Sequence, residues 1–540
     1  MNALLNTLAG LIAGSILCVH AVRAEPPTLK GLQPVGLQRG TEATLKVLGT
    51  LKNRPVSVWS DQSDVTLKLA EDKDELTVSV PADAAPGRRW VRFYNNEGSS
   101  DLVPLQIGLL PELVEAEPNN RLTEATAVES LPVTINGVLH KSQEVDVFRV
   151  HLQAGETLVA AVEAHEPLGT PMDGVLQLVA ENGFVLAQND DAQGMDPLLT
   201  WTAAEAGDVY VRLFAFPATP DSSIRFAGGD EFVYRLTLTA GPFVSHVLTP
   251  TASNEGGQLA IIGWNVPDGP LDPFTTPGLQ HARAERWLSG DMTHFTNSDS
   301  AVDAAPLLTR DASTTGLIGA AGTTQRWGFS AAKGEAVRLE VIAREIGSPL
   351  DPVLTITDRA GKRKKDADDV SRENLDVDLT WKAPADGEYV AMITDRFGAG
   401  SERHVYQLLL SREEPRVELT VDAGRFVLTR DKALDISIKV DRKAGHQAKL
   451  IFSVEGLPDG LTVAEAVSEP KGETAKLVKL KLEAGTAGEF NGPVRLVARD
   501  EAGDVAGNVT AGSPLEGVRV EDLWLTITPK AVPETDSGVP

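Results

Sequence analysis

The stretch Val147-Phe-Arg-Val-His-Leu152 indicates how this chain folds. Its apolar residues alternate with polar ones, and a period of two is typical of a strand with one buried face. The turn Ala154-Gly-Glu156 follows, and a second apolar segment, Leu158–Val162, begins soon after it. The pattern predicts two successive β-strands. Similar patterns fill most of the remaining sequence.

The unit that contains this stretch occurs twice. Four motifs return in the same order: Gly169-Thr-Pro-Met-Asp173 as Gly347-Ser-Pro-Leu-Asp351, Asp190-Asp191 as Asp368-Asp369, Leu199-Thr-Trp201 as Leu379-Thr-Trp381, and Gly207-Asp-Val-Tyr210 as Gly387-Glu-Tyr389. The offset is 178 residues at the first motif and 180 at the third, so the second copy carries a short insertion. Ordered matches of this length indicate a duplication, with copies over 113–240 and 309–412.

Period-two patterns also flank the duplicated units. Residues 26–109 and 413–530 each alternate apolar and polar residues between turn signals such as Pro86-Gly87. Roughly seven short strands in the first of these segments predict an immunoglobulin-like sandwich, and we expect the same class in the second. Residues 241–308 hold a short strand at Gln258–Trp264 and an irregular run, which we interpret as a partial immunoglobulin-like segment and linker. The predicted fold class is all-β, with tandem β-sandwich domains.

The N-terminal residues indicate export. Met1–Ala24 has an apolar run and a small-residue cleavage site, as in a secretory signal peptide. An uncleaved N-terminal anchor is the alternative, since no Lys or Arg precedes the apolar run. Cys18 is the only cysteine, so a mature chain would have no disulfide and no thiolate metal site. We expect the polar, Pro-containing tail at 531–540 to be disordered.

The charge of the chain excludes some partners. The formal net charge is −26 over 540 residues, which disfavours nucleic acid and anionic membrane surfaces. No segment after the first 24 residues has the eighteen uninterrupted apolar residues of a membrane span. We therefore expect a secreted, periplasmic or cell-surface protein without a membrane span once the signal is cleaved.

An acidic loop precedes the first strand pair of the first copy. In Glu115-Ala-Glu-Pro-Asn-Asn120, Pro118 keeps the segment out of helical geometry. Oxygen ligands in a short irregular loop suit a hard cation such as Ca²⁺. The candidate ligands are Glu115, Glu117, Asn119, Asn120 and Asp146. The alternative is a solvated turn whose side chains cap backbone groups.

The second copy lacks this loop. No similar acidic segment precedes it, and Gln325 stands where Asp146 would be. The fold is therefore predicted twice and the cation loop once. Since the loop is not needed for the fold in general, we expect Ca²⁺ in the first copy alone.

These motifs together resemble a known family. Glu115-x-Glu-Pro-Asn-Asn120, Asp146-Val-Phe148, Ala154-Gly-Glu156, Asn189-Asp-Asp191 and Gly207-Asp-Val-Tyr210 resemble the bacterial pre-peptidase C-terminal (PPC) domain. That domain is a β-sandwich found beside secreted proteases and is close in fold to collagen-binding domains of clostridial collagenases. The first copy resembles it well and the second is degenerate. Residues 27–49 resemble IPT/TIG domains, and the arrangement is similar to exported multidomain proteins of planctomycete-type bacteria.

The resemblance implies a calcium site at the acidic loop. Asn120 stands where the family has a carboxylate, and Gln143 where it has another acidic ligand, although Glu144 is adjacent. Fewer formal charges lower the affinity for calcium. The expectation is therefore one weakly bound Ca²⁺ rather than a two-ion cluster.

The search for catalytic motifs is negative. His165-Glu166 has no second histidine to complete a zinc-protease helix, and no Gly-x-Ser-x-Gly elbow occurs. Asn189-Asp-Asp191 is interpreted as a polar β-turn. Trp201 and Trp381 are interpreted as core residues, with a ligand-stacking platform as the alternative.

We therefore expect a non-enzymatic, exported binding or scaffold protein whose first PPC-like domain holds Ca²⁺. Its partner would be an extracellular or cell-surface protein or a polysaccharide. The alternative is an accessory or maturation partner of a secreted peptidase or other hydrolase. Carbohydrate or collagen binding through exposed aromatic residues is a third possibility, which the 5% aromatic content makes weaker.

Overall fold

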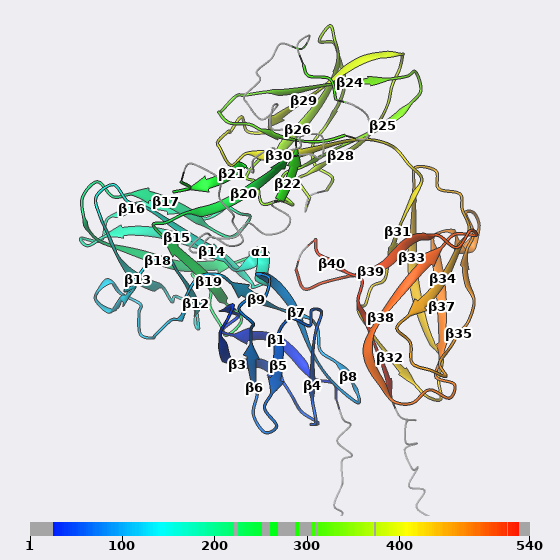
Figure 1. Ribbon diagram of the computed structural model, residues 1–540, viewed down its shortest axis with the longest axis horizontal. Helices are drawn as coiled ribbons and strands as arrows, with labels where there is room; N and C mark the ends of the chain where they lie inside the picture. Colours follow the sequence, from blue (N-terminus) through cyan, green and yellow to red (C-terminus); the bar gives the residue numbers. More distant parts are fainter. Residues whose placement is uncertain are drawn as a thin grey trace, which may run out of the picture.

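In the computed structural model, the regular secondary structure of the chain is almost entirely β-strand, as predicted (Figure 1). Within the described residues, no helix has the length and apolarity that a membrane crossing would require. The predicted signal peptide (1–24) and tail (531–540) lie outside the described residues. The structure covers residues 25–220, 225–250, 260–267, 287–290, 302, 305–308, 312–371, 374–515 and 517–528.

The N-terminal domain is a sandwich of two sheets, with strand orders β1-β3-β6-β5 and β2-β9-β7-β4. Alternating apolar residues of both sheets, such as Leu45, Val78 and Leu105, fill the space between them. The sequence predicted roughly seven strands and the structure has nine, because the two- and three-residue strands are too short to show a period. The strands are β1 (Thr28–Gln33), β2 (Gly36–Gln38), β3 (Glu42–Thr50), β4 (Ser57–Ser60), β5 (Thr66–Leu69), β6 (Glu75–Ser79), β7 (Gly87–Asn95), β8 (Gly98–Ser99) and β9 (Val103–Gly108).

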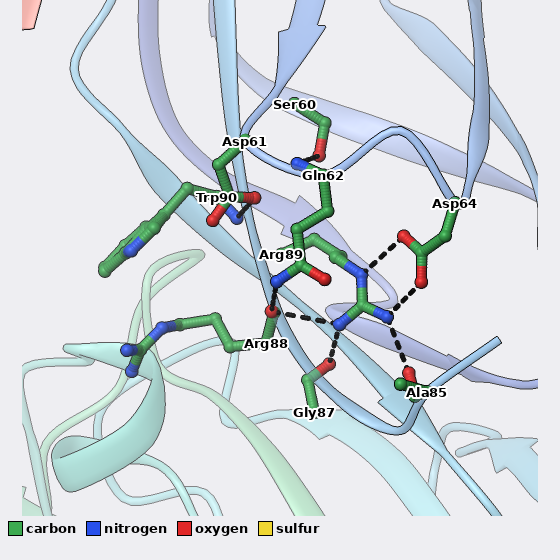
Figure 2. A network of polar contacts seen from close by, with 9 residues as sticks. All are labelled: Ser60, Asp61, Gln62, Asp64, Ala85, Gly87, Arg88, Arg89 and Trp90. Atoms are coloured by element: carbon green, nitrogen blue, oxygen red, sulfur yellow. Dashed lines mark hydrogen bonds and ion pairs between the residues drawn. The ribbon is translucent and has the colours of Figure 1, made fainter. Parts of the chain in front are cut away.

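A buried arginine fixes one end of this domain. Figure 2 shows Arg89 of β7 reaching the loop after β4, where its Nε donates to Asp64 Oδ1 at 2.8 Å. Its other nitrogens donate to backbone carbonyls, including that of Ala85 at 2.6 Å. The Trp90 amide donates to the Asp61 carboxylate at 2.8 Å in the same network. These bonds join two irregular segments to a central strand.

The first repeat is a sandwich of two five-stranded sheets, β10-β12-β19-β14-β17 and β11-β13-β18-β15-β16. Phe148, Val150 and Leu152 of the stretch that opened the sequence analysis all point into its core. The elements are β10 (Glu112–Val114), η1 (Leu122–Glu124), β11 (Thr126–Ala127), β12 (Val133–Val138), β13 (Asp146–Leu152), β14 (Thr157–Glu163), α1 (His165–Leu168), β15 (Met172–Ala180), β16 (Val185–Asn189), β17 (Leu198–Thr202), β18 (Gly207–Pro217) and β19 (Val233–Thr239).

Within the described residues, the second repeat has the same topology without strands equivalent to β10 and β11, although Leu307 forms a single parallel bridge with Gly328. Its sheets are β23-β30-β25-β28 and β24-β29-β26-β27, which match β12-β19-β14-β17 and β13-β18-β15-β16 one for one. The strands are β23 (Ala312–Leu317), β24 (Gln325–Ala331), β25 (Ala336–Ile342), β26 (Pro352–Asp358), β27 (Arg363–Ala367), β28 (Val377–Lys382), β29 (Gly387–Asp395) and β30 (Val405–Arg412). This correspondence supports the duplication inferred from sequence.

A three-stranded sheet lies between the repeats. It consists of β20 (Phe243–Pro250), β21 (Ala260–Trp264) and β22 (Trp287–Gly290). Phe243 and Trp264 pack against the first repeat, while His246 Nε2 lies 3.1 Å from the Ile346 carbonyl oxygen of the second. The predicted partial immunoglobulin-like segment at 241–308 is therefore at least partly a spacer. Most of residues 265–308 lie outside the described residues.

The C-terminal domain is a network of eleven strands around one apolar core. Its longest path runs β32-β41-β38-β39-β31-β33-β37-β35. The elements are β31 (Arg416–Thr420), β32 (Arg425–Thr429), β33 (Leu434–Lys443), β34 (Leu450–Glu455), β35 (Thr462–Val463), β36 (Ala466–Ser468), η5 (Glu473–Ala475), β37 (Leu477–Glu483), β38 (Phe490–Arg499), β39 (Val505–Gly512), β40 (Arg519–Val520) and β41 (Leu523–Thr528).

Candidate metal centre in the first repeat

The acidic loop crosses from one sheet of the first repeat to the other. Before it, β10 pairs in parallel with β12; after it, β11 pairs in parallel with β13. Two backbone bonds hold the loop itself, since the Glu115 amide donates to the Asn136 carbonyl and the Val147 amide to the Asn119 carbonyl, each at 3.0 Å. The loop therefore covers one end of the sandwich and connects the first strand of one sheet, β10, to the first strand of the other, β11.

Three carboxylates converge at this end. Each of Glu115, Glu117 and Asp146 offers an oxygen that lies within 4.8 Å of the others. Asp146 is fully buried and Glu115 is partly buried, whereas Glu117 faces solvent. Negative charges that are buried this close together repel strongly unless a proton or cation lies among them.

A tyrosine completes the inner side of the cluster. The Tyr234 hydroxyl lies 2.6 Å from Asp146 Oδ2 and 2.8 Å from Glu115 Oε2. A hydroxyl has one proton and can donate to one of these oxygens at a time. The Val138 amide donates to the remaining oxygen of Glu115.

The electrostatics of the cluster follow from burial. Burial raises the pKa of the Asp146 carboxyl well above its usual range, and the neighbouring Glu115 charge raises it further. Burial also raises the pKa of Glu115. Both shifts have the sign expected for carboxylates that lack a positive partner.

Asn119 is buried and points into the same space. Its side-chain oxygen lies 3.3 Å from Glu117 Oε1 and 3.2 Å from Asp146 Oδ1, so it meets acceptors alone. Oxygens in this arrangement suit a shared cation. An amide turned over would instead donate its NH₂ group to both carboxylates. The side chain thus has one reasonable orientation with a cation and another without it.

The other predicted ligands lie at the edge of the cluster or outside it. Asn120 donates its Nδ2 to Glu117 Oε2 at 3.3 Å and so orients that carboxylate. Glu144 does not join the carboxylates, because its Oε2 accepts the Lys141 amide of its own turn at 3.0 Å. Gln143 occupies a left-handed position of the same turn, with φ of 71°.

The second repeat carries a neutral version of this arrangement. Gln325 begins β24 as Asp146 begins β13, and the Tyr406 hydroxyl donates to its Oε1 at 2.7 Å. The Trp327 indole in turn donates to Tyr406 at 2.7 Å. The scaffold is thus present twice, with carboxylates in one copy and uncharged hydrogen bonds in the other.

Sequence reasoning missed Tyr234. A signal was available, because Tyr234 and Tyr406 occupy equivalent positions in β19 and β30, each opposite a glycine of the neighbouring strand. The repeats also share a buried cap that the sequence analysis did not single out. Asp196 accepts the amides of residues 164–166, and Asp376 accepts those of residues 343–345.

The remaining motifs have structural roles. Asn189 Oδ1 accepts the amides of Ala192 and Leu198, which fits the expected polar turn. Trp381 is buried in the core of the second repeat, and Trp201 packs against the core of the first.

Comparisons with known proteins give local similarities. No protein-family model matches the chain. A stretch of 98 residues is 31% identical to a probable subtilase-type serine protease of Deinococcus radiodurans, covering 18% of this chain. The match spans only 14% of the length of that protein.

Solved structures add neighbours of the β-sandwich class. The pre-peptidase C-terminal domain of a collagenase from Bacillus anthracis matches 20% of this chain and 93% of its own, with 12% identity and a TM-score of 0.16. Fibronectin(III)-like modules of CbhA from Clostridium thermocellum match 41% of this chain and 94% of their own, with 15% identity and a TM-score of 0.13. The assignment of this chain to the class rests on its own sheets.

Proposed function

We propose that this chain is an exported, non-catalytic scaffold or binding protein whose first repeat is stabilised by one Ca²⁺. The ligands would be Glu115, Glu117, Asn119 and Asp146, with Asn120 orienting Glu117. The observation that carries the proposal is the convergence of Glu115, Glu117 and Asp146, whose oxygens lie within 4.8 Å of one another around the fully buried Asp146. A hard cation prefers oxygen ligands of this kind.

The physical role of the ion would be to join the two sheets. Glu115 directly follows β10 of one sheet, and Asp146 begins β13 of the other. A cation bound by both would neutralise their repulsion and fix the loop that connects β10 to β11. Because the unfolded chain has no such site, the binding free energy would stabilise the folded repeat.

Thermal unfolding of the full chain tests this role. Adding millimolar CaCl₂ after treatment with a chelator should raise the melting temperature of the first repeat. Glu117→Gln should abolish the increase, because it removes a ligand charge at an exposed position. Glu124→Gln is the matched control, since Glu124 is an exposed acid of the same segment that lies outside the cluster. An equal calcium response in E117Q and the wild type would contradict the proposal.

The accessory role for a secreted hydrolase is the second candidate. It is favoured by the likeness of 98 residues to a probable subtilase-type protease. Co-purification of the tagged chain from its native host should then retain a peptidase, and removing the chain should lower the secreted peptidase activity. A chain that is recovered alone and whose loss leaves this activity unchanged would exclude this role.

A further inference from the structure

The first and last domains of the chain contact each other, as Figure 1 shows where β8 and β32 lie side by side. Trp524 of β41 is the centre of the contact. Its ring lies 5.7 Å from that of Trp59, nearly perpendicular to it, and 5.0 Å from that of Tyr94. Trp524 is only 2% exposed. Buried aromatic residues of this kind dominate the energy of many interfaces.

Further contacts extend this interface on both sides. Leu515, in the turn between β39 and β40, packs with Trp90 and Leu102 of the N-terminal domain. Arg425 donates to the Ser99 carbonyl at 2.7 Å and forms an ion pair with Asp101 at 2.9 Å. We call the apolar part of this interface, formed by Trp59, Trp90, Tyr94, Leu102, Leu515 and Trp524, the clasp.

The clasp closes the chain into a ring. Leu515 also reaches the first repeat, because its Cδ2 lies 3.0 Å from the position that a Cβ on Gly169 would occupy. The path from the N-terminal domain through both repeats to the C-terminal domain therefore returns to its start (Figure 1).

Closing the clasp buries a cation beneath Trp524. Arg92 is 2% exposed, and its guanidinium lies 5.5 Å from the Trp524 ring centroid. Its Nη1 donates to two neutral groups, Ser99 Oγ and the Ser100 carbonyl, each at 3.1 Å. Among the residues that the structure describes, Arg92 Nε and Trp524 Nε1 have no hydrogen-bond partner. Burial lowers the pKa of Arg92 to about 10. Desolvation of this cation opposes closure, whereas its cation–π contact with the Trp524 ring and the attraction of the Asp101 carboxylate favour it.

The connection between the second repeat and the C-terminal domain is polar. Residues 413–415 connect β30 to β31, and Arg416 forms a long ion pair with Asp378 of the second repeat at 4.0 Å. Ion pairs of this kind at a solvent-exposed joint contribute little rigidity. The connection between the N-terminal domain and the first repeat differs. There, Arg235 is buried between Glu112 and Glu163. It also packs against Gly36 and Gly108 of the N-terminal domain.

We propose that the C-terminal domain, residues 416–528, is a hinged arm that the clasp holds in a closed ring. When the clasp opens, the arm turns about residues 413–415 and uncovers the aromatic face of the N-terminal domain at Trp59, Trp90 and Tyr94. Aromatic stacking and the cation–π contact of Arg92 favour the closed ring, and desolvation of Arg92 opposes it. This proposal is independent of the calcium site.

Cross-linking of the full chain tests the hinged arm. Asp101→Cys and Arg425→Cys, placed in a Cys18→Ser background, put one thiol on each side of the clasp. A short bismaleimide applied at low protein concentration should join them within single molecules. Adding Trp524→Ala should shift the closing equilibrium toward the open state by about tenfold or more, as for an interface hot spot, and should increase the maximum dimension in small-angle X-ray scattering.

Two further variants complete the test. Arg92→Met should raise the cross-linking yield, because it keeps the packing and removes the buried charge. Leu477→Ala is the control, since Leu477 is 45% exposed on β37, outside the clasp. The proposal would be overturned if the protein with the D101C and R425C substitutions alone did not cross-link. It would also be overturned if adding W524A and adding R92M both left the cross-linking yield unchanged. If W524A does not fold, the R92M result alone decides.

Discussion

At the scale of single residues, the two repeats differ most at the start of their second core strand. Asp146 is a buried carboxylate beside Glu115, whereas Gln325 satisfies the same tyrosine position without charge. The second repeat shows that the scaffold tolerates a neutral amide there. The fold therefore accepts either an acid or a neutral amide at this position, and the proposed cation would account for the acid in the first repeat.

Asp146→Asn should have opposite effects with and without calcium. In chelator it should stabilise the first repeat by about 1–2 kcal/mol, because it removes a buried like charge that raises the pKa of Asp146. In calcium it should abolish the increase in melting temperature. Chemical denaturation of the full chain under both conditions measures the two effects. Destabilisation in chelator would show that the Asp146 charge has a structural role of its own.

The Asp64–Arg89 ion pair should make the stability of the N-terminal domain depend on pH. Hydrogen bonding to Arg89 lowers the pKa of Asp64, so the pair stabilises the folded state above the unfolded pKa of Asp and loses this contribution as pH falls through the lower folded value. Asp64→Asn should cost about 1–2 kcal/mol at pH 7, since the carboxylate is partly exposed, and the difference should shrink toward about pH 3. Urea unfolding at both pH values checks this, with the exposed Asp83→Asn as control.

The candidate site residues could be predicted because they are close in sequence and polar where a strand begins. Glu115, Glu117 and Asn119 lie within a stretch of five residues, and Asp146 directly precedes the alternating segment Val147–Leu152. Tyr234 could not be predicted in the same way, since it lies in an apolar strand and its hydroxyl gives no periodic signal. Only comparison with Tyr406, at the same register in the second repeat, identifies it.

At the scale of elements, long strands were predictable and short ones were not. The period-two pattern predicted the strand that is now β13, because Phe148, Val150 and Leu152 alternate over the core. β10 and β11 were missed, because strands of three and two residues show no period. These two strands frame the acidic loop, so the sequence indicated its candidate ligands without indicating which strands they connect.

In each repeat, the glycine opposite the buried tyrosine leaves no space for a larger residue. A Cβ on Gly137 would lie 2.2 Å from the Tyr234 ring, and one on Gly316 would lie 2.1 Å from the Tyr406 ring. Gly137→Ala and Gly316→Ala should each destabilise their repeat by about 3 kcal/mol through overpacking. Thermal unfolding measures the loss, with Gly207→Ala as the control because no atom lies within 4 Å of the added methyl. Wild-type stability of either variant would contradict this packing.

At the scale of the whole molecule, the sequence predicted the all-β class of the domains but not their arrangement. The ion pair between Arg425 and Asp101 joins residues 324 positions apart, and no local pattern indicates such a contact. Trp524 reads as one more apolar residue of a period-two strand. Its role in closing the ring follows from its neighbours in space, Trp59 and Tyr94.

Isothermal titration of the chelator-treated full chain with CaCl₂ tests the central claim most directly. The account predicts binding of one ion per chain in the wild type and in E124Q, and loss of that binding in E117Q and D146N. Binding that persists in both ligand variants, or no binding by the wild type at millimolar calcium, would contradict a calcium site at the acidic loop.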